Sequence, residues 1–569
     1  MSSNTSPEFD AIVVGSGISG GWAAKELTER GLKVLLVERG PHITHREDYS
    51  GEDKAPWEMP FAGRIPEEEA NRDYFVQKDC YALEGATKKF FVNDRIHQYI
   101  HPKEKPFSWI RGYQLGGRSQ LWARQTYRWS DIDFRANKTD GHGIDWPIRY
   151  QDIAPWYDHV EKFAGISGSL EGLDQLPDGK FLPPMKMNCV EVEAKQKIEK
   201  AFPTRKMIIG RCANLTEPTK EHLELGRGRC QYRNECEKGC SFGASFSSLS
   251  ATLPAARRTN NLTTVTDAIV HSVTYDNVSK RATGVKIIDA NSKDNRQYSG
   301  RIIFLCASTL GSTQIMLNSI SESFPNGIGN SSGTLGHYLM DHIFMSGARG
   351  EHPGFQENYY SGRRPNGIYI PRYRNVTEKD DRFLRGYGFQ GGASRPNWRR
   401  GLNMQGIGLE LKEKLREPGS WQFHLGGFGE MLPDKRNRVL LDKNKQDQWG
   451  IPLLTIECEL HDNELKMLAA MADDAEAMLS AAGIINIQKY SEDAPPGLAI
   501  HEMGTARMGH NPSSSVLNKF NQTHDVSNLF VTDGSAMTSS ACQNPSLTYM
   551  ALTARASAYA VHLLKEGKI

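Results

Sequence analysis

The sequence predicts an α/β protein whose first unit is a parallel sheet assembled from three separated stretches of the chain. Residues 10–38 read as strand, glycine turn, helix and strand, and such a β-α-β unit is expected to cross over right-handed and to build a parallel sheet. Strand and helix patterns return at residues 301–319 and 529–564. Because 569 residues exceed what one hydrophobic core usually organises, we expect a second unit whose segments interleave with the first.

The overall composition excludes some classes of partner. The formal net charge is only +2 and no run of five or more like charges occurs, so the electrostatic footprint of a nucleic-acid-binding protein is missing. Nine cysteines in so long a chain do not make a disulfide framework. Residues 1–9 lack the basic and apolar regions of a secretory signal, and no apolar run is long enough to span a membrane. We expect a protein that is soluble or that a partner carries to or across a membrane, which leaves the compartment open.

The N-terminal elements are predicted from hydrophobic patterning. Residues 10–14 form an apolar run typical of a buried strand, 15–20 a tight glycine turn, 21–30 a helix and 33–38 a second strand.

The glycine turn carries the first chemical signal. Gly15, Gly17 and Gly20 match the G-x-G-x-x-G fingerprint of dinucleotide-binding proteins. The first glycine permits the turn, the second lets backbone approach a pyrophosphate at the helix N-terminus, and the third lets helix and strand pack closely. Glu38, at the end of the second strand, is placed to accept hydrogen bonds from a ribose 2′-hydroxyl, and its charge argues against a 2′-phosphate. The fingerprint predicts a dinucleotide site without identifying the dinucleotide.

Beyond residue 40, the sequence predicts further helices and strands separated by long connections. Residues 40–111 are irregular and predict long surface connections with short helices, and residues 150–165 predict a helix at the entry to the second unit. The remaining predicted elements are strands within 261–289, a buried strand at 301–307, a helix at 310–319, a turn feeding a strand at 437–442, an amphipathic helix at 465–481, a strand at 529–533 and a long helix at 546–564.

Several segments together resemble the glucose-methanol-choline (GMC) oxidoreductase family, which uses FAD. They are the N-terminal fingerprint, the glycine-rich segment 116–122, the segment 306–319, and the C-terminal block 501–509 with 531–535 and 544–545. Shorter matches at 336–342 and 437–439 extend the resemblance over nearly the whole chain. The C-terminal block is most similar to that of the sugar-oxidising branch, which includes bacterial glucoside 3-dehydrogenases, gluconate 2-dehydrogenase catalytic subunits and pyranose oxidases.

The resemblance implies a fold and a set of cofactor contacts. The fold is a Rossmann-like FAD-binding domain, expected over residues 1–150, 241–330 and 496–569, interleaved with a substrate domain built on an antiparallel sheet over 151–240 and 331–495. By the same resemblance, the glycine-rich segment lies along the flavin, Asp533 and Gly534 lie against the ribityl chain, and Val270 holds the adenine through its backbone. The cofactor residues expected from the resemblance are Gly116, Gly117, Ser119, Val270, Asp533, Gly534 and Pro545.

The sequence departs from the family pattern at three places. Some sugar-oxidising relatives attach FAD covalently through a histidine in the glycine-rich segment, where this chain has Leu121, so noncovalent FAD is expected. Trp122 and Ala123 stand where many relatives place an asparagine near the flavin, which leaves the contacts of that region open. Residues 313–314 are Thr-Gln where Ser-Pro or Thr-Pro is usual.

His501 and Asn544 are the predicted catalytic pair. Oxidation of an alcohol removes a proton from oxygen and a hydride from carbon, so a base must face the hydride acceptor, flavin N5. An imidazole suits this task because its pKa lies near working pH. Asn544 can hold the same oxygen without competing for the proton, and the pair matches the His/Asn form of the family's catalytic pair. Isolated histidines such as His342 and His424 are interpreted as packing or surface residues.

Three cysteines form a C-x5-C-x3-C cluster: Cys230, Cys236 and Cys240. Thiolates this close in sequence can converge on a soft metal or an iron–sulfur cluster. The spacing is similar to that of GMC catalytic subunits that bear a three-iron cluster and pass electrons to a cytochrome. Structural thiols are the main alternative, because cluster-free relatives also carry cysteines here, and a zinc site with His222 is a third.

The sequence therefore predicts an FAD-dependent dehydrogenase that oxidises a secondary hydroxyl of a sugar or glycoside, with C3 of a glucoside as the specific expectation. Two rival functions remain: a sugar oxidase that uses dioxygen, and a lyase that keeps FAD only structurally. The resemblance also suggests a small signal-bearing subunit and a cytochrome acceptor as partners. The sugar and carbon, the electron acceptor and the oligomeric state stay open.

Overall fold

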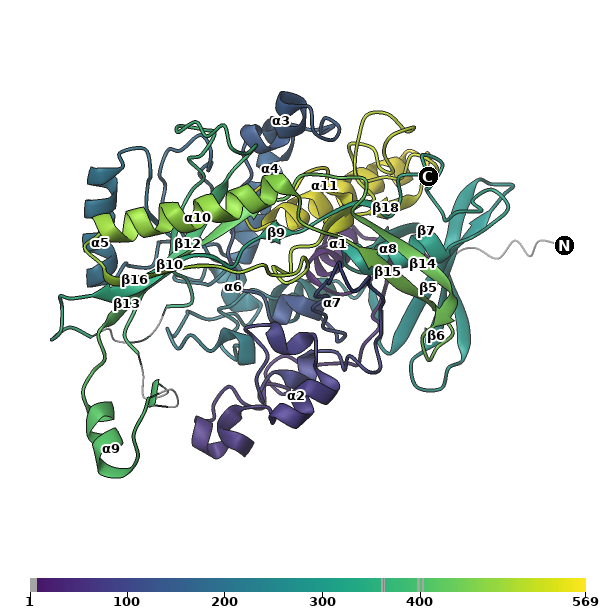
Figure 1. Ribbon diagram of the computed structural model, residues 1–569. Coiled ribbons are helices and arrows are strands. Elements are labelled where there is room, and N and C mark those ends of the chain that lie inside the picture. Colours follow the sequence, from purple (N-terminus) through teal and green to yellow (C-terminus); the bar gives the residue numbers. More distant parts are fainter. Residues whose placement is uncertain (1–7, 360–361, 363, 397–399, 402–403) are drawn as a thin grey trace.

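The computed structural model describes residues 8–359, 362, 364–396, 400–401 and 404–569, which fold into a mixed α/β architecture (Figure 1). The predicted fold class is confirmed, because one large sheet contains the parallel strands and a second large sheet is antiparallel. The predicted boundaries between two interleaved domains stay a prediction.

The parallel part of the first sheet is built from strands far apart in the sequence. Its order is β4–β2–β1–β7–β18, and every neighbouring pair is parallel. The strands are β1 (Phe9–Val14), β2 (Val34–Val37), β4 (Leu262–Val265), β7 (Asn295–Leu305) and β18 (Leu529–Val531). Strands β1, β2 and β18 are almost wholly buried, which accounts for their continuous apolar runs.

An antiparallel extension continues this sheet. The first half of β7 pairs with β6 (Arg281–Asp289), which pairs with β5 (Ala268–Asp276). β7 therefore belongs to the extension at its start and to the parallel strands at its end, because its residues 300–305 pair with β1.

Helices cover the parallel strands. α1 (Ile18–Glu29) packs against α11 (Ser546–Lys565), and α11 packs against α4 (Tyr150–Ala164). The helix predicted after the glycine turn thus begins at Ile18 rather than at residue 21, because Gly20 lies inside its first turn. The helix predicted at 310–319 is α8 (Thr309–Asn318), which packs on β5.

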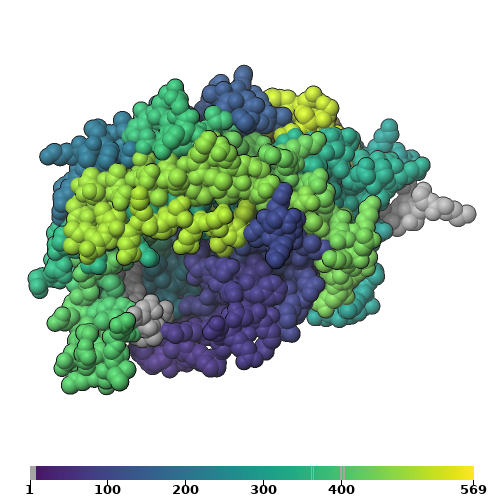
Figure 2. Space-filling model, in the orientation of Figure 1, coloured from purple at the N-terminus to yellow at the C-terminus, as the bar shows by residue number. Residues whose placement is uncertain are grey.

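The second large sheet is antiparallel, with the order β16–β10–β13–β12–β11–β3 and β9 beside β13. Its strands are β3 (Ile208–Ile209), β9 (His342–Ile343), β10 (Ser346–His352), β11 (Ile368–Ile370), β12 (Tyr387–Ser394), β13 (Trp421–Glu430) and β16 (Ile485–Ser491). The predicted amphipathic helix is α10 (Asp462–Ala481), which buries Met467, Met471 and Met478 in one core with this sheet. Its other side is exposed along one face of the molecule (Figure 2).

A small third sheet, β15–β14–β8–β17, brings two functional segments together. β8 (His337–Met340) pairs with β17 (Met503–Thr505), and Met340 lies opposite Met503. The residues just after β8 and just before β17 are therefore neighbours in space. The other two strands are β14 (Arg438–Gln446) and β15 (Pro452–Glu457).

The remaining helices are short, and most lie in connections. They are α2 (Glu67–Asp73), α3 (Asp131–Asp140), α5 (Cys189–Ala201), α6 (Lys220–Glu224), α7 (Leu253–Arg258) and α9 (Gly408–Arg416). Residues 40–111 contain α2 and 3-10 turns, as predicted, but the prediction of surface connections is wrong for part of the segment, because Phe90, Trp109 and Ile110 are buried in the core. In the described part of the chain, each helix is too short or too polar to cross a bilayer.

Candidate active site

One elongated cavity collects the predicted site residues. The glycine turn and Val270 line it, as do His501 and Asn544, and all predicted catalytic and cofactor residues except Gly20 and Gly116 are part of its wall. The cavity lies at the carboxyl ends of β1, β2 and β7 and reaches the antiparallel sheet at Gln390 and Phe428. This is where ligands bind in parallel α/β sheets.

The three fingerprint glycines each meet a different geometric demand. A Cβ atom on Gly20 would lie 1.8 Å from the carbonyl oxygen of Gly15, so only glycine lets α1 pack this close to the turn. Gly15 has φ +90°, and a Cβ there would lie 2.5 Å from the carbonyl oxygen of Cys306. A Cβ on Gly17 would meet no protein atom within 4 Å and would project into open space at the helix start. That open space beside backbone N–H groups fits a phosphate group.

Glu38 is buried at the end of β2, and its carboxylate joins the turn to the next loop. Oε2 accepts hydrogen bonds from the N–H and hydroxyl of Ser16, and Oε1 accepts one from the N–H of Gly40 at 2.9 Å. Burial raises the pKa of Glu38, although these hydrogen bonds act in the opposite direction. Glu38 lines the cavity, so its predicted contact with a ribose is compatible with its position.

The glycine-rich segment lies directly on the turn. Gly116, with φ +89°, donates its N–H to the hydroxyl of Ser16 at 2.8 Å, and a Cβ on Gly117 would lie 3.3 Å from the Cα of Gly17. The hydroxyl of Ser119 accepts the N–H of Ser248 at 3.0 Å. Residues about a hundred positions apart thus form one wall of the cavity.

Asp533 and Gly534 follow β18, on the same side of the sheet. The Asp533 carboxylate accepts hydrogen bonds from the Ser312 hydroxyl of α8 and from the N–H of Ser535 at 3.0 Å. Asp533 is 4% exposed, and burial raises the pKa of its carboxyl group. The carboxylate therefore fixes the loop that carries it, while Gly534 lines the cavity.

His501 and Asn544 meet at the far end of the cavity, as the sequence predicts. Nε2 of His501 lies 3.4 Å from Nδ2 of Asn544. The Oδ1 atom of Asn544 accepts a hydrogen bond from Nε2 of Gln390 at 2.7 Å, so its NH₂ group is turned toward His501. Both side chains can thus reach one oxygen atom placed beside them.

A second histidine, which sequence reasoning treated as a packing residue, contacts the first. Nδ1 of His342 lies 2.9 Å from Nδ1 of His501, and the two rings meet edge to face. His342 is 3% exposed and begins β9, two residues after the end of β8, so the β8–β17 pairing accounts for the contact. His342 is thus a buried, hydrogen-bonded core residue, as interpreted from the sequence, but one of its partners is the predicted base.

The loop before His501 is held by a buried carboxylate. Asp341 accepts the N–H groups of Gly497 at 2.7 Å, Ala499 at 3.2 Å and His501 at 3.0 Å. Burial and the charge of Glu502 raise the pKa of Asp341 to about 7.

Arg118 faces this loop from the glycine-rich segment. Its guanidinium makes a bidentate pair with Glu502, with nitrogen–oxygen distances of 3.1 and 2.9 Å. Burial, together with the neighbouring His342 and Arg118, lowers the pKa of His501 well below its usual value of 6.5. The imidazole is therefore neutral near pH 7, the form in which it can accept a proton.

Aromatic rings form one side of the catalytic end. Phe344 and Phe428 stack with ring centroids 5.7 Å apart, and Phe428 lies 6.2 Å from the His501 ring. Gln125 and Gln390 add amide groups to the same cavity. The wall therefore offers an apolar face and a few hydrogen-bonding groups, a combination typical of small-molecule sites.

The departures from the family pattern also lie here. Leu121, Trp122 and Ala123 line the cavity, and Leu121 carries no atom able to form a covalent bond to a cofactor. Nε1 of Trp122 donates to the carbonyl oxygen of Phe246 at 2.8 Å, which fixes the indole in the wall.

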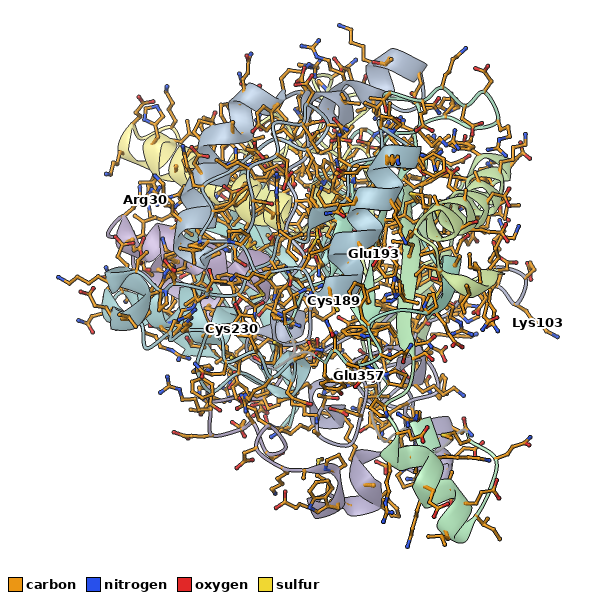
Figure 3. The ribbon with its side chains drawn as sticks, turned by 90° about the vertical axis from the view of Figure 1, so that its left-hand side faces the viewer. Arg30, Lys103, Cys189, Glu193, Cys230 and Glu357 are labelled. Atoms are coloured by element: carbon orange, nitrogen blue, oxygen red, sulfur yellow. The ribbon has the colours of Figure 1, made fainter. Side chains whose placement is uncertain are left out.

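The cysteine cluster does not form a metal site in this structure. Cys230 and Cys240 pack with Cys212 in a small apolar core, and Cys236 accepts a hydrogen bond from Asn214. Cys189, at the start of α5, lies apart from Cys230 (Figure 3). Burial raises the pKa of the Cys230 thiol to about 11.

The zinc alternative is not supported either. Nδ1 of His222 accepts the N–H of Thr219 at 3.1 Å, and Nε2 lies 3.1 Å from the carbonyl oxygen of Lys162, so both ring nitrogens are engaged within the protein. Across the residues whose structure is described, no group of three or more His, Cys, Asp or Glu side chains is arranged to hold a metal ion.

Comparisons with known proteins agree with this geometry. A sequence profile described as GMC oxidoreductase matches residues 9–344, and a second of the same description matches residues 433–553. The 2-methyl-1,2-propanediol dehydrogenase of Mycolicibacterium austroafricanum is 28% identical over 580 residues, which cover 97% of this chain and 95% of that protein.

Two further similarities span the full length. The fructose dehydrogenase large subunit of Gluconobacter japonicus is 25% identical over 581 residues, which cover 99% of this chain and 100% of that subunit. Among solved structures, a formate oxidase of Aspergillus oryzae superposes with a TM-score of 0.60 at 13% identity, covering 99% of this chain and 100% of the other. At that identity the structural likeness supports the fold alone.

Proposed function

The chain belongs to the GMC oxidoreductase family, and from this premise we propose that it binds FAD noncovalently and oxidises a secondary hydroxyl of a sugar or glycoside. One observation carries the proposal: His501 and Asn544 converge at one end of a cavity whose other end is the glycine turn. An oxidoreductase acting on CH–OH groups needs both ends, one to hold a cofactor and one to hold and deprotonate an alcohol.

The glycine turn, Glu38, Val270, Asp533 and Gly534 are the residues that would hold FAD. The open space at Gly17 accommodates a phosphate, and the formate oxidase with the similar fold was studied for FAD modification. When bound, FAD supplies the acceptor for the hydride that leaves the alcohol carbon. Noncovalent binding is supported by Leu121, because no nucleophilic atom stands at that position.

His501 is the proposed general base. Nε2 of its neutral imidazole accepts the hydroxyl proton, while the NH₂ group of Asn544 donates a hydrogen bond to the same oxygen and orients it. The carbon loses a hydride and the oxygen a proton, so the product is a carbonyl compound. A positioned base of this kind contributes about 10²- to 10⁴-fold to the rate.

The proposed substrate class is a sugar or glycoside, with C3 of a glucoside as the specific proposal. A sugar ring has an apolar face suited to Phe344 and Phe428, and hydroxyls suited to Gln125 and Gln390. The fructose dehydrogenase large subunit adds support for sugars, whereas the propanediol dehydrogenase shows that a related chain takes a small diol.

The proposed electron acceptor is a partner protein rather than dioxygen. The relative from Gluconobacter japonicus is named a large subunit, which supports a further subunit as a partner of this chain, and we propose that the partners include a small signal-bearing subunit and a cytochrome. An iron–sulfur cluster at Cys230, Cys236 and Cys240 stays a prediction, and we assign no electron path through it because these thiols are not arranged as metal ligands. Analysis for iron and acid-labile sulfide tests that prediction.

Anaerobic mixing with a panel of glucosides, gluconate, free sugars and small diols tests the function. We expect a glucoside to bleach the flavin absorbance and to yield a 3-keto sugar, identified by NMR. A lyase would leave the flavin oxidised, and an oxidase would release hydrogen peroxide once air is admitted. If only small diols bleach the flavin, the sugar proposal is wrong while the oxidoreductase assignment stands.

A further inference from the structure

Three groups form a hydrogen-bonded chain behind the catalytic end of the cavity. His342 lies between His501 and Ser540: its Nδ1 is 2.9 Å from Nδ1 of His501, and its Nε2 is 3.1 Å from the carbonyl oxygen of Ser540. His342 does not line the cavity, so it acts on a bound alcohol only through His501.

The hydrogen bonds from Ser540 through His342 to His501 determine which ring nitrogens carry a hydrogen. A carbonyl oxygen only accepts hydrogen bonds, so Nε2 of His342 carries a hydrogen. A neutral imidazole has one N–H, so Nδ1 of His342 is an acceptor and the hydrogen between the two rings belongs to Nδ1 of His501. Nε2 of His501 is then unprotonated, and its lone pair faces the NH₂ group of Asn544.

We propose that His342 is a positioning residue that holds His501 in the tautomer with the proton on Nδ1, so that the lone pair of Nε2 faces the alcohol. This inference rests on the proposed function, because it gives His501 the role of base. In water a neutral histidine side chain favours the opposite tautomer, with the proton on Nε2, and in that form His501 could not accept the hydroxyl proton.

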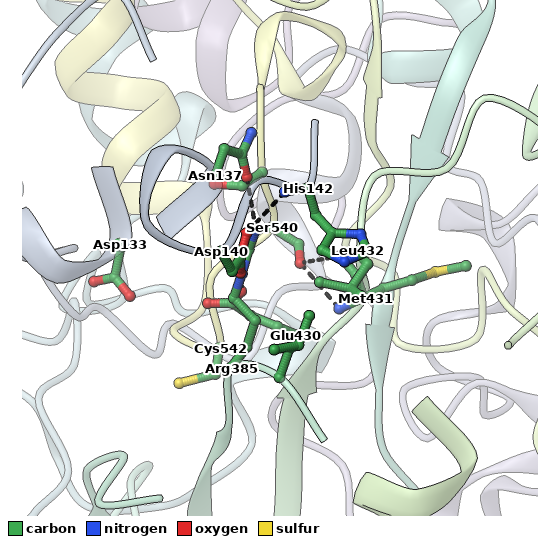
Figure 4. A network of polar contacts seen from close by, with 12 residues as sticks. Asp133, Asn137, Asp140, His142, Arg385, Glu430, Met431, Leu432, Ser540 and Cys542 are labelled. Atoms are coloured by element: carbon green, nitrogen blue, oxygen red, sulfur yellow. Dashed lines mark hydrogen bonds and ion pairs between the residues drawn. The ribbon is translucent and has the colours of Figure 1, made fainter. Parts of the chain in front are cut away.

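The fold supports His342 on both sides. β9 pairs with β13 so that His342 lies opposite Glu430. The Ser540 hydroxyl accepts the N–H of Met431 at 3.1 Å and donates to the Met431 carbonyl at 3.0 Å, which fixes the segment whose carbonyl His342 contacts (Figure 4). The reciprocal pair formed by the Ser540 hydroxyl therefore helps to hold in place the residue that carries the carbonyl acceptor.

The charges around the two rings agree with neutral imidazoles. Burial lowers the pKa of His342 to about 4, against the opposing effect of Glu430. Glu430 itself is paired with Arg372 and Arg385, with nitrogen–oxygen distances of 3.3 and 2.9 Å, and Arg118 faces His501. With both rings neutral near pH 7, the hydrogen between them belongs to Nδ1 of His501, which donates it to Nδ1 of His342.

Two substitutions and one control separate positioning from packing. His342→Leu removes both hydrogen bonds, whereas His342→Gln offers an amide N–H to Ser540 and an amide oxygen to His501, so it can preserve the tautomer. His352→Leu removes another buried histidine of the same sheet, whose Nδ1 accepts the N–H of Gly354 and which has no contact with His501 among its hydrogen bonds.

The rate constant of anaerobic flavin reduction and its substrate dependence are measured for each holoprotein. We expect His342→Leu to lower the limiting rate constant by about 10- to 1,000-fold, with little change in substrate affinity. This range lies between the loss caused by removing a residue that only orients a functional histidine and the loss caused by a wrong tautomer of a catalytic histidine. His342→Gln recovers most of the rate, and His352→Leu matches the wild type. A His342→Leu rate within twofold of wild type, or a glutamine variant as slow as the leucine variant, overturns the proposal.

A second readout does not depend on turnover. ¹⁵N NMR of the imidazoles, with His501 assigned from the His501→Asn variant, should show a protonated Nδ1 and a bare Nε2 in the wild-type holoprotein. A protonated Nε2 there overturns the proposal even if His342→Leu fails to fold. If no alcohol reduces the wild-type flavin, the proposed function fails separately, and the NMR result still decides the tautomer.

Discussion

Nε2 of His501 lies 3.4 Å from Nδ2 of Asn544, although 43 residues separate the two in the chain. The β8–β17 pairing fixes the first residue, and the start of α11 together with Gln390 fixes the second. Each is therefore positioned by a different part of the fold, and the space that both face is continuous with the glycine turn.

Gly17 gives the sharpest test of the cofactor site. Gly17→Ala should leave the fold intact, because the added Cβ meets no protein atom within 4 Å and the backbone φ of −63° suits alanine. It should weaken FAD binding at least tenfold, since the methyl group occupies the space where a phosphate approaches backbone N–H groups. Flavin content and the dissociation constant of FAD, measured by flavin fluorescence, check this outcome.

Gly228→Ala is the matched control. A Cβ at Gly228 meets its nearest atom at an ordinary 3.4 Å, and the residue does not line the cavity. Equal FAD affinity in the two variants would contradict the assignment of the phosphate site to Gly17.

The pH dependence of flavin reduction should report Asp341 rather than His501. His501 stays neutral well below pH 6.5, while Asp341 ionises near pH 7. The ionised carboxylate accepts its three backbone N–H bonds more strongly and steadies the loop of His501. We therefore expect the rate constant to fall as the pH drops through about 7 and to reach a lower, nonzero plateau.

Asp341→Asn should remain at the lower plateau at every pH, because its side chain cannot ionise. A wild-type profile that falls to zero near pH 6.5, and that Asp341→Asn leaves unchanged, would show that His501 itself titrates there.

Glu430 should be important for stability. It is fully buried between Arg372 and Arg385, and Asp140 offers Arg385 a second partner (Figure 4). Glu430→Gln leaves the buried guanidinium of Arg372 without the carboxylate that it pairs with. We expect the free energy of unfolding to fall by about 3–5 kcal/mol. Urea unfolding followed by circular dichroism measures the change. Glu410→Gln, in an exposed pair with Lys414, should give no resolvable change, and similar losses in both variants would contradict this account.

The flavin should be released by denaturation. Leu121 offers no covalent attachment, so precipitation with acid should leave the yellow flavin in the supernatant, identified as FAD by chromatography. Flavin retained in the protein pellet would show a covalent bond to another residue of the cavity wall.

The fold was largely predictable because its strongest signals are local. The glycine turn, the apolar strands and the amphipathic α10 each follow from residues within about twenty positions of one another. His501 and Asn544 were predictable from the C-terminal block, but that block gives no indication of what lies behind them.

The supporting residues could not be predicted for a physical reason. His342 becomes significant only through the pairing of β8 with β17, and Gln390 only because β12 passes beside the start of α11. Both contacts join segments more than 150 residues apart, and neither residue type is distinctive alone. The cysteine cluster is the opposite case: its spacing in sequence predicts a cluster site, which stays a prediction, because no group of three or more possible ligands among the described residues is arranged to hold a metal ion.

The limiting rate constant of anaerobic flavin reduction in His501→Ala tests the central claim most directly. With a substrate that bleaches the wild-type flavin, we expect a decrease of about 10²- to 10⁴-fold at unchanged flavin content, partly restored by added imidazole. A His501→Ala rate within a few-fold of wild type would contradict the account, because His501 would then not be needed to accept the hydroxyl proton.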